Sequence, residues 1–552
     1  MKTIIYQALP RLWGNRNETR QQNGTLQQNG SGKMNDFSPT VLKQLREMGV
    51  THVWYTGLLR HASKTDYGKI GVPRQHPAVV KGQAGSPYAI ADYYDIDPDL
   101  AVKPEHRLEE FRKLVERTHR AGLKVVMDFV PNHVARQYHS VCKPKGVKDL
   151  GEGDDVNIGF TTRNNFYYCP GQAFTPYFDL YAGEKQPYIE EPARATGNDH
   201  FDNAPGRNDW YETIKLNYGV DYYAGRIGHF LPIPDTWHKM LYILLFWADH
   251  GVDAFRCDMA EMVPAEFWQW ATMQVKEQYP GLQFIGEVYN PAEYRRYLAA
   301  GFDLLYDKVG MYDALRALTC GQTDVQAVSS AWQQTDDIRQ HMLYFLENHD
   351  EQRIASDFFA GDGRRGLPAL AVSLLLGTNP FMLYMGQSMG ERGMDEEGFS
   401  GRDGRTTIFD YWSMDTLCRN AKGQLTDEEK SLSQAYRQLM AIAQKQPAIG
   451  EGKMFDLCYV NRHQPRIFSF MRKAGKQTLL VVANFSDAET EAHVIIPRAA
   501  FDYLELKEGS RMATELMSMG AQQAAESISM EADKATRLKV DAWGVRVLNI
   551  KH

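Results

Sequence analysis

The amino-acid sequence predicts an α/β protein built on a (β/α)8 barrel, with an inserted domain after the third strand and a C-terminal antiparallel β-sandwich domain. Three observations lead to this class. Short apolar runs alternate with helical segments through most of the chain, as they do where parallel strands are joined by crossover helices. The alternation breaks once, after the third run. Beyond residue 448 it gives way to runs typical of antiparallel strands.

Eight of the apolar runs qualify as barrel strands, and eight is the number that closes a TIM barrel. They cover residues 4–8, 52–55, 124–130, 252–256, 283–286, 302–306, 342–346 and 381–384. The segments between them carry helix signals. Ser38-Pro39 opens a helix that ends at Gly49, and Pro104-Glu105 opens one that ends at Gly122.

The break in the alternation contains about a hundred residues rich in Gly, Pro, Asn, Asp and Tyr before the helix near Thr236. This composition predicts an inserted domain. Near the end of the chain, RIFSFMR, TLLVVANF, AHVIIP and GVRVLNI predict a separate β domain. We therefore expect the barrel at 1–133 and 218–448, the insertion (domain B) at 134–217 and the β-sandwich at 449–552.

Composition and charge exclude several functions. The 552 residues are 43% hydrophobic and carry a net charge of −7, without a tract rich in Lys and Arg. Nucleic acid is therefore not an expected partner, and a neutral or polar substrate fits better. No apolar run is long enough to span a membrane. The six cysteines lack paired spacing and the first residues read as a strand, so we expect a cytoplasmic protein with reduced thiols and no organic cofactor.

Polar side chains end four of the predicted strands, and barrel active sites are assembled from such positions. The third strand ends in DFVPNH (128–133), the fourth in DAFRCD (253–258), the fifth in FIGE (284–287) and the seventh in FLENHD (345–350). Four strand ends of one barrel would therefore bring these groups to a common site.

Within this set, Arg256 and Asp258 are two residues apart and point to the same side of an extended segment. A neighbouring cation favours an ionised Asp258, the state a nucleophile needs, whereas Glu287 follows an apolar strand and is better placed to keep a proton. Two carboxyl groups in opposed environments predict a nucleophile and a general acid.

Four further residues are candidates for binding a sugar. Asp350, together with His349 and His133, offers partners for hydroxyl groups, and the ring of Tyr88 can stack on a pyranose face. Each residue also has a plain structural explanation, since an acidic residue at a strand end often caps the next helix and Asn132 fits a turn as readily as a metal site. That explanation does not account for their joint placement on successive strand ends.

These motifs, in this order, resemble those of the α-amylase family of glycoside hydrolases over nearly the whole chain. The resemblance implies Asp258 as nucleophile, Glu287 as acid/base and Asp350 as the carboxylate that binds the distorted sugar. It also implies four residues that contact the sugar to be attached covalently: Tyr88, His133, Arg256 and His349. Asn132 matches a position that binds a structural Ca2+ between barrel and insertion in many members.

Two segments depart from the common pattern of that family. Asp258 is followed by Met259-Ala260-Glu261 where many α-amylases have Lys-His, which puts the calcium site in question. The segment IKLN (214–217) is similar to that of neopullulanase-like members, so the preference between α-1,4 and α-1,6 bonds stays open.

The leading hypothesis is hydrolysis, with retention, of mainly α-1,4 bonds in starch-like glucans or malto-oligosaccharides through a covalent glycosyl-enzyme. An alternative resolves the same intermediate with a second sugar, as a glucanotransferase or disaccharide isomerase does. A third, a non-catalytic glycan-binding relative, is disfavoured because all three carboxylates are present. Endo or exo action and oligomeric state stay open.

Overall fold

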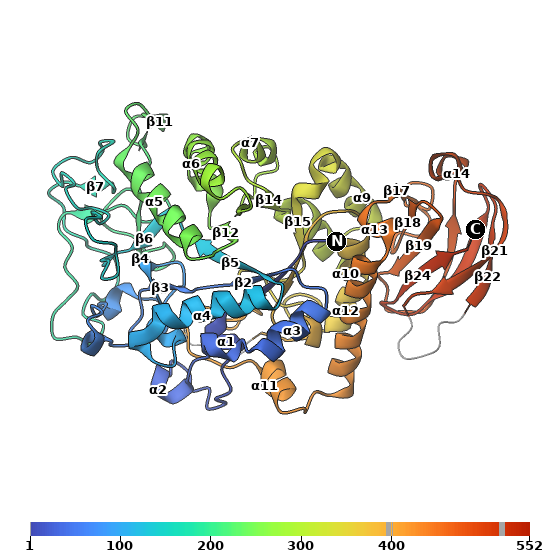
Figure 1. Ribbon diagram of the computed structural model, residues 1–552, viewed down its shortest axis with the longest axis horizontal. Helices are drawn as coiled ribbons and strands as arrows, with labels where there is room; N and C mark the ends of the chain where they lie inside the picture. The colour runs from blue at the N-terminus through green and yellow to red at the C-terminus, as the bar shows by residue number, and fades with distance from the viewer. Residues whose placement is uncertain (1, 394–398, 400, 518–524, 552) are drawn as a thin grey trace.

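The computed structural model describes residues 2–393, 399, 401–517 and 525–551 (Figure 1). Its centre is a closed barrel in which every strand pairs in parallel with its neighbours. The strands are β1 (Ile4–Ala8), β2 (His52–Tyr55), β5 (Lys124–Phe129), β12 (Ala254–Cys257), β13 (Gln283–Gly286), β14 (Leu304–Tyr306), β15 (Met342–Phe345) and β16 (Phe381–Tyr384). The predicted barrel and all eight of its strands are confirmed.

Side chains of the barrel strands point alternately inward and outward, so they form two apolar layers: one inside the barrel and one between the barrel and the surrounding helices. In β5, Val126 points inward and packs with Trp54 and Ile285, whereas Val125 and Met127 point outward to the helices. Successive side chains of a strand face opposite sides, so one apolar run fills both the barrel interior and the layer beneath the helices. This is why the strands read as continuous apolar runs.

Helices surround the barrel. One begins at the predicted Pro39, and a 3-10 turn at the predicted Pro104 leads into another that begins at Arg107. The larger ones are α3 (Pro39–Glu47), α4 (Arg107–Arg120), α5 (Asp235–Asp249), α6 (Ala265–Gln278), α9 (Val325–Gln334), α10 (Leu367–Leu375) and α12 (Asp427–Lys445). Ser38 accepts a hydrogen bond from the Val41 amide at the start of α3. Thr426 and Glu429 form a reciprocal capping box at the start of α12.

The segment between β5 and α5 contains only short strands and long loops. Here β6 (His133–Ala135) pairs with β9 (Thr213–Lys215), β7 (Tyr168–Cys169) with β8 (Ala193–Arg194), and β10 (Val220–Asp221) with β11 (Ile227–Gly228). Buried charge supplements this sparse pairing. Burial alone would raise the pKa of Glu190, but the guanidinium groups of Arg136 and Arg194 lower it to about 2. The carboxylate therefore stays ionised and ties the loops together.

The C-terminal part is a sandwich of two antiparallel sheets, as predicted. The larger sheet has the order β17 (Lys453–Asp456), β18 (Ile467–Ala474), β19 (Gln477–Asn484), β24 (Val545–Ile550), β21 (Gly509–Glu515) and β22 (Ala525–Met530). The smaller sheet pairs β20 (Thr490–Ile495) with β23 (Ala535–Val540). Leu480 of β19 packs between the sheets against Val494 and Leu538. Its neighbours Leu479 and Val481 face the barrel helices.

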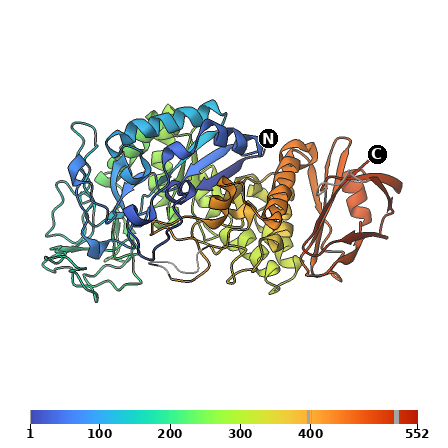
Figure 2. The ribbon, with the colours of Figure 1, turned by 90° about the horizontal axis from the view of Figure 1, so that it is seen from below.

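The arrangement is elongated (Figure 1, Figure 2): the segment between β5 and α5 lies at one end, the sandwich at the other and the barrel between them. None of the helices among the described residues combines the length and the apolar character needed to cross a membrane.

Candidate active site

Arg256, on β12, lies at the centre of the predicted site. Its guanidinium contacts Asp258 Oδ1 at 2.7 Å through Nη1 and Glu287 Oε2 at 2.9 Å through Nη2. The same group is fully buried and lies 5.1 Å from the ring centre of Trp54. One buried cation therefore holds the two carboxylates predicted to perform the chemistry.

Glu287, at the end of β13, is fixed by two further donors. The backbone amide of Met259 donates to Oε2 at 2.8 Å, and the Tyr289 hydroxyl donates to Oε1 at 2.6 Å. Met259 has a left-handed backbone (φ 42°), which a non-glycine residue rarely adopts and which turns its amide toward Glu287. Burial and the Glu287 charge raise the pKa of Tyr289 well above its ordinary value, so this hydroxyl remains a donor.

The sequence predicted that Arg256 would favour ionisation of Asp258 alone and that Glu287 would keep a proton. In the structure Arg256 contacts both carboxyl groups. Burial raises the pKa of Asp258 well above its usual range, Arg256 opposes the rise, and Glu287 and Asp350 reinforce it. Burial also raises the pKa of Asp350, to about 7, with Glu287 acting in the same direction and Arg256 against it. Arg256 is shared, so its proximity alone does not set Asp258 apart from Glu287.

His349 and Tyr88 form a stacked pair beside the two carboxylates. Their ring centres are 5.1 Å apart, and the Tyr88 hydroxyl lies 2.6 Å from His349 Nε2. Gln7 Nε2 lies 2.8 Å from the other ring nitrogen, and Asp350 Oδ2 lies 3.1 Å from Nε2. Burial and the Arg256 charge lower the pKa of His349 well below its ordinary value, so the ring is neutral. A neutral imidazole both donates and accepts hydrogen bonds, which suits sugar hydroxyls.

Asp258, Glu287, Asp350 and Tyr88 line a cavity of about 360 Å³, whereas the buried Arg256 and His349 are not among its lining residues. His133, from β6, forms part of its wall beside Trp210, with the two ring centres 5.3 Å apart. Burial and the charges of Lys215 and Lys81 lower the pKa of His133 to about 3. The cavity is lined by Lys81, Ser86, Tyr88, His133, Trp210, Glu212, Thr213, Asp258, Met259, Glu287, Tyr289, Asp350 and Phe409. Side chains from the barrel and from the segment after β5 thus share one site.

The sequence analysis missed several residues that shape this site. Asp128, at the end of β5, accepts hydrogen bonds from Trp54 Nε1 and the Gly57 amide, and its Oδ1 lies 3.9 Å from Arg256. Its position inside DFVPNH could have identified it. Glu261 accepts from the backbone amides of Tyr289 and Asn290 and so ties the turn after Asp258 to the loop after β13. That link has no local signature in the sequence.

The surroundings of Asn132 do not fit the calcium site that the resemblance implies. The Lys215 ammonium donates a hydrogen bond to Asn132 Oδ1 and lies 2.6 Å from Asp199 Oδ1. Asn132 Nδ2 donates to the Gly197 carbonyl at 2.8 Å. Calcium requires several oxygen ligands, and here a buried ammonium already occupies the oxygens of Asn132 and Asp199. The predicted role of Asn132 as a metal ligand is therefore not supported by its contacts.

One acidic cluster in the described part of the chain has the spacing of a metal site: Asp92, Asp95 and Cys142. Its carboxylates already have partners. Arg60 and Arg107 pair with Asp95, and Asp92 accepts from the Val141 and Cys142 amides. The cluster is thus neutralised by arginines and backbone amides.

A parallel barrel whose strand ends bring two carboxylates onto one arginine, with a third beside them, defines a glycosidase of the barrel class. Comparison with known families agrees. The family described as "Alpha amylase, catalytic domain" matches residues 27–445. The chain belongs to the α-amylase family of glycoside hydrolases and is thus an enzyme that acts on O-glycosyl bonds, which confirms the resemblance.

Individual relatives are distant. Alpha-amylase 3 of Dictyoglomus thermophilum is 23% identical over 424 residues, which cover 73% of this chain and 74% of that protein. Neopullulanase 2 of Thermoactinomyces vulgaris is 20% identical over 499 residues, covering 88% and 69%. A noncanonic maltogenic alpha-amylase from Thermotoga neapolitana has a TM-score of 0.64 at 20% identity, with 100% of this chain and 99% of that chain covered. At this identity the structural likeness supports the fold alone.

Proposed function

We propose that this protein hydrolyses mainly α-1,4 bonds of starch-like glucans and malto-oligosaccharides with retention of configuration. The proposal rests on one observation: the buried Arg256 holds Asp258 and Glu287 together at the wall of the cavity. A retaining mechanism uses two carboxyl groups about 5 Å apart, one as nucleophile and one as acid/base. Two carboxylates on a single guanidinium group suit this close spacing.

In the first step, a carboxylate oxygen of Asp258 attacks the anomeric carbon. The glycosidic C–O bond breaks, and the departing oxygen takes the proton of Glu287. Three carboxyl groups and one guanidinium favour a site that retains a proton, because full ionisation would leave uncompensated negative charge. The proposed first step takes a proton from Glu287 and requires Asp258 to be ionised, and Arg256 neutralises the charge of Asp258.

In the second step, water attacks the anomeric carbon of the glycosyl-enzyme and releases Asp258. Glu287, now ionised, accepts the proton of this water and returns to its initial state. Asp350 lines the cavity and can bind hydroxyls of the sugar ring while positive charge develops there, and the neutral His349 contacts Asp350 at 3.1 Å. The rings of Tyr88 and Trp210 form apolar parts of the same wall.

The test is the product course from maltoheptaose, followed by NMR, for wild type, Asp258→Asn and Asp202→Asn. Asp202 is an exposed carboxylate of the segment after β5 and serves as the control. We expect α-configured first products from wild type and control, and none from Asp258→Asn. First products of β configuration, or a fully active Asp258→Asn, would contradict the proposal.

A second experiment separates the roles of the two carboxyl groups. Fluoride leaves without protonation, so α-maltosyl fluoride requires the nucleophile but not the general acid. We expect Glu287→Ala, which still lacks the base of the second step, to release fluoride far faster than it cleaves maltoheptaose, and Asp258→Asn to act on neither. Equal losses on both substrates in Glu287→Ala would argue against its role as the acid.

Transfer to a second sugar is the alternative outcome of the same intermediate. The cavity wall carries Trp210, Tyr289 and Phe409, and such rings can bind an acceptor sugar and exclude water. Incubation with maltotriose distinguishes the two outcomes. A transferase would accumulate products longer than the substrate, whereas a hydrolase would not.

We also propose a cytoplasmic location. All six cysteines are free thiols, and four of them are buried. Thiols persist in a reducing compartment and are uncommon in secreted proteins. Fractionation of the native cells, with an antibody against this chain, tests the proposal.

A further inference from the structure

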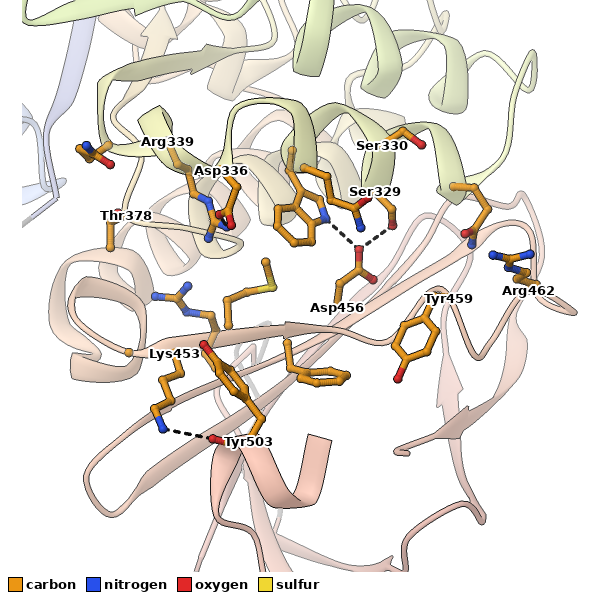
Figure 3. Close-up of a pocket in the computed structure, with 18 residues that line it drawn as sticks. Ser329, Ser330, Asp336, Arg339, Thr378, Lys453, Asp456, Tyr459, Arg462 and Tyr503 are labelled. Atoms are coloured by element: carbon orange, nitrogen blue, oxygen red, sulfur yellow. Dashed lines mark hydrogen bonds and ion pairs between the residues drawn. The ribbon is translucent and has the colours of Figure 1, made fainter. Parts of the chain in front are cut away.

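A larger cavity, of about 730 Å³, lies between the barrel and the C-terminal sandwich (Figure 3). We call it the interdomain groove. One wall comes from α9 and the 3-10 helix η8 (Asp336–His341), and the other from β17, the loop after it and α14 (Arg498–Leu504). It shares no lining residue with the cavity that holds Asp258 and Glu287. The groove is therefore separate from the active site.

The sandwich side of the groove carries a row of three aromatic rings. The ring centre of Phe455 lies 6.0 Å from that of Tyr503 and 6.1 Å from that of Tyr459. Tyr503 is 49% exposed and Tyr459 is 45% exposed. Half-exposed rings in a row within a cavity offer apolar faces on which the C–H faces of sugar rings can stack.

The barrel side of the groove is polar. Gln333, Asp336 and Gln340 are exposed along it, and Arg339 lies across the ring of Trp332, 5.0 Å from its centre. The buried Nε of Arg339 has no hydrogen-bond partner among the described residues. Amide, carboxylate and guanidinium groups are suitable partners for sugar hydroxyls, which both donate and accept hydrogen bonds.

The two walls are held in a fixed relation. The buried Asp456, on β17, accepts hydrogen bonds from Ser329 Oγ and, at 2.8 Å, from Trp332 Nε1, both on α9 (Figure 3). The buried Arg472, on β18, donates to the carbonyls of Leu376, Ala448 and Ile449. A groove with walls that are already fixed loses little conformational entropy when it binds a ligand.

The charges of the groove favour a neutral ligand over a phosphorylated one. Four cations line it, and three are already engaged: Arg339 with Asp336, Lys453 with Glu505, and Arg472 with three carbonyls. The fourth, Arg462, is a single exposed guanidinium. A phosphate site needs donors that converge on the anion. A chain of neutral sugars needs the combination present here, a row of rings opposite amide and carboxylate groups.

We propose that the interdomain groove binds a stretch of α-glucan several sugar residues long and so holds a polymeric substrate on the enzyme away from the active site. The choice of an α-glucan rests on the proposed function. The groove lengthens the contact with a long chain, whereas a short oligosaccharide needs only the smaller cavity. Its effect is therefore expected on polymers and not on maltotriose.

The test is native electrophoresis in gels with and without amylopectin, together with kcat/KM for maltotriose. The double variant Tyr459→Ala/Tyr503→Ala should bind amylopectin about tenfold more weakly, because it lacks two stacking rings. Its kcat/KM for maltotriose should be unchanged. The control is Tyr242→Ala on α5, a tyrosine of similar exposure (43%) outside the groove, which should behave as wild type.

Two further variants distinguish the loss of the aromatic rings from misfolding. Tyr459→Phe/Tyr503→Phe keeps the rings and should bind as wild type, and the single Tyr503→Ala should bind with intermediate strength. If the alanine variants hydrolyse maltotriose normally and are retarded by amylopectin as strongly as wild type, the groove is not a glucan site. If wild type hydrolyses no α-glucan but loses retardation with the two rings, the proposed function fails and the groove stands.

Discussion

Arg256 provides one positive charge for the three carboxyl groups of the site. Asp258 and Glu287 contact it directly, and it also lowers the pKa that burial raises at Asp350. Like charges that share one cation are costly to ionise together, so a site of this kind lowers the stability of the folded protein at neutral pH. Replacing one of the carboxyl groups should recover part of that stability.

Asp350→Asn is expected to raise the melting temperature at pH 8 by about 2 °C. In the folded protein the pKa of Asp350 is raised from 3.8 to about 7, so ionisation costs stability as pH rises through this range, fully above pH 7 and not at all below 4. The gain should therefore shrink as pH falls and vanish near pH 4. Thermal scans from pH 4 to 8 measure it, with the exposed Asp502→Asn as control. A gain independent of pH would contradict the argument.

Tyr289→Phe is expected to lower kcat on maltoheptaose about tenfold or more with little change in KM. The variant removes the hydroxyl that donates to Glu287 Oε1 at 2.6 Å; Glu287 becomes charged as it gives up its proton in the first step, and a hydrogen bond to a charged group contributes about 1.5–3 kcal/mol. The ring that lines the cavity is kept. Steady-state kinetics beside Tyr242→Phe, which removes a hydroxyl outside the cavity, give the comparison. A change confined to KM would show that the hydroxyl serves binding and not the carboxylate.

The pairing of β6 with β9 places the buried Lys215 at the junction of barrel and insertion, opposite His133 in the register. Its ammonium contacts both Asn132, which lies between β5 and β6, and Asp199, which lies in the loop between β8 and β9. A cation of the protein itself thus holds two segments that the family resemblance would connect through calcium. The consequence can be measured without any ligand.

Lys215→Met should destabilise the protein by about 3 kcal/mol, because it leaves the amide oxygen of Asn132 without this donor and the largely buried Asp199 carboxylate with only the exposed Arg226, 3.8 Å away, as a cation among the described residues. A chelator should leave the melting temperature of wild type unchanged. Calorimetry with and without EDTA measures both effects, and Lys476→Met, at an exposed lysine, is the control. A marked loss of stability of wild type in EDTA would show that a metal contributes after all.

The barrel strands could be predicted because each is an apolar run flanked by residues typical of loops. Their order around the barrel is the same as their order in the sequence. The short strands of the insertion could not, since two residues, as in β7 or β8, carry no period. Asp258, Glu287 and Asp350 could be predicted as site residues because each directly follows an apolar run that was recognised as a barrel strand. Tyr289 was missed because its contact with Glu287 depends on how the loop after β13 turns, which no residue pattern states.

Arg472 contributes to the contact between barrel and sandwich, and no motif in the sequence indicated this role. The guanidinium is buried and donates to three backbone carbonyls, one from the end of α10 and two from α13 (Pro447–Gly450). Burial and the Arg339 charge lower its pKa to about 10. The expected division of the chain at 133, 217 and 448 stays a prediction; Leu376 and Ala448 lie before its last boundary, and Ile449 and Arg472 lie after it.

Arg472→Met should lower the free energy of unfolding by about 3 kcal/mol, because three buried carbonyls lose their donor. Urea unfolding followed by tryptophan fluorescence measures it, and the exposed Arg537→Met is the control. Maltotriose hydrolysis by the folded variant should be unchanged, since Arg472 does not line the cavity that holds Asp258 and Glu287. A loss of stability no larger than that of the control would show that the sandwich is held by apolar packing alone.

Closure of the barrel joins β1 to β16, whose paired residues, such as Ile4 and Phe381, lie 377 positions apart in the chain. At synthesis rates of about 5–20 residues per second, the first strand leaves the ribosome roughly 20–70 s before its second neighbour exists. During that time one edge of β1 has no native partner and can pair with strands of other nascent chains. The protein is thus expected to depend on chaperones during its synthesis more than after it, and a circular permutant that begins at β2 would move this exposure to another strand without removing it.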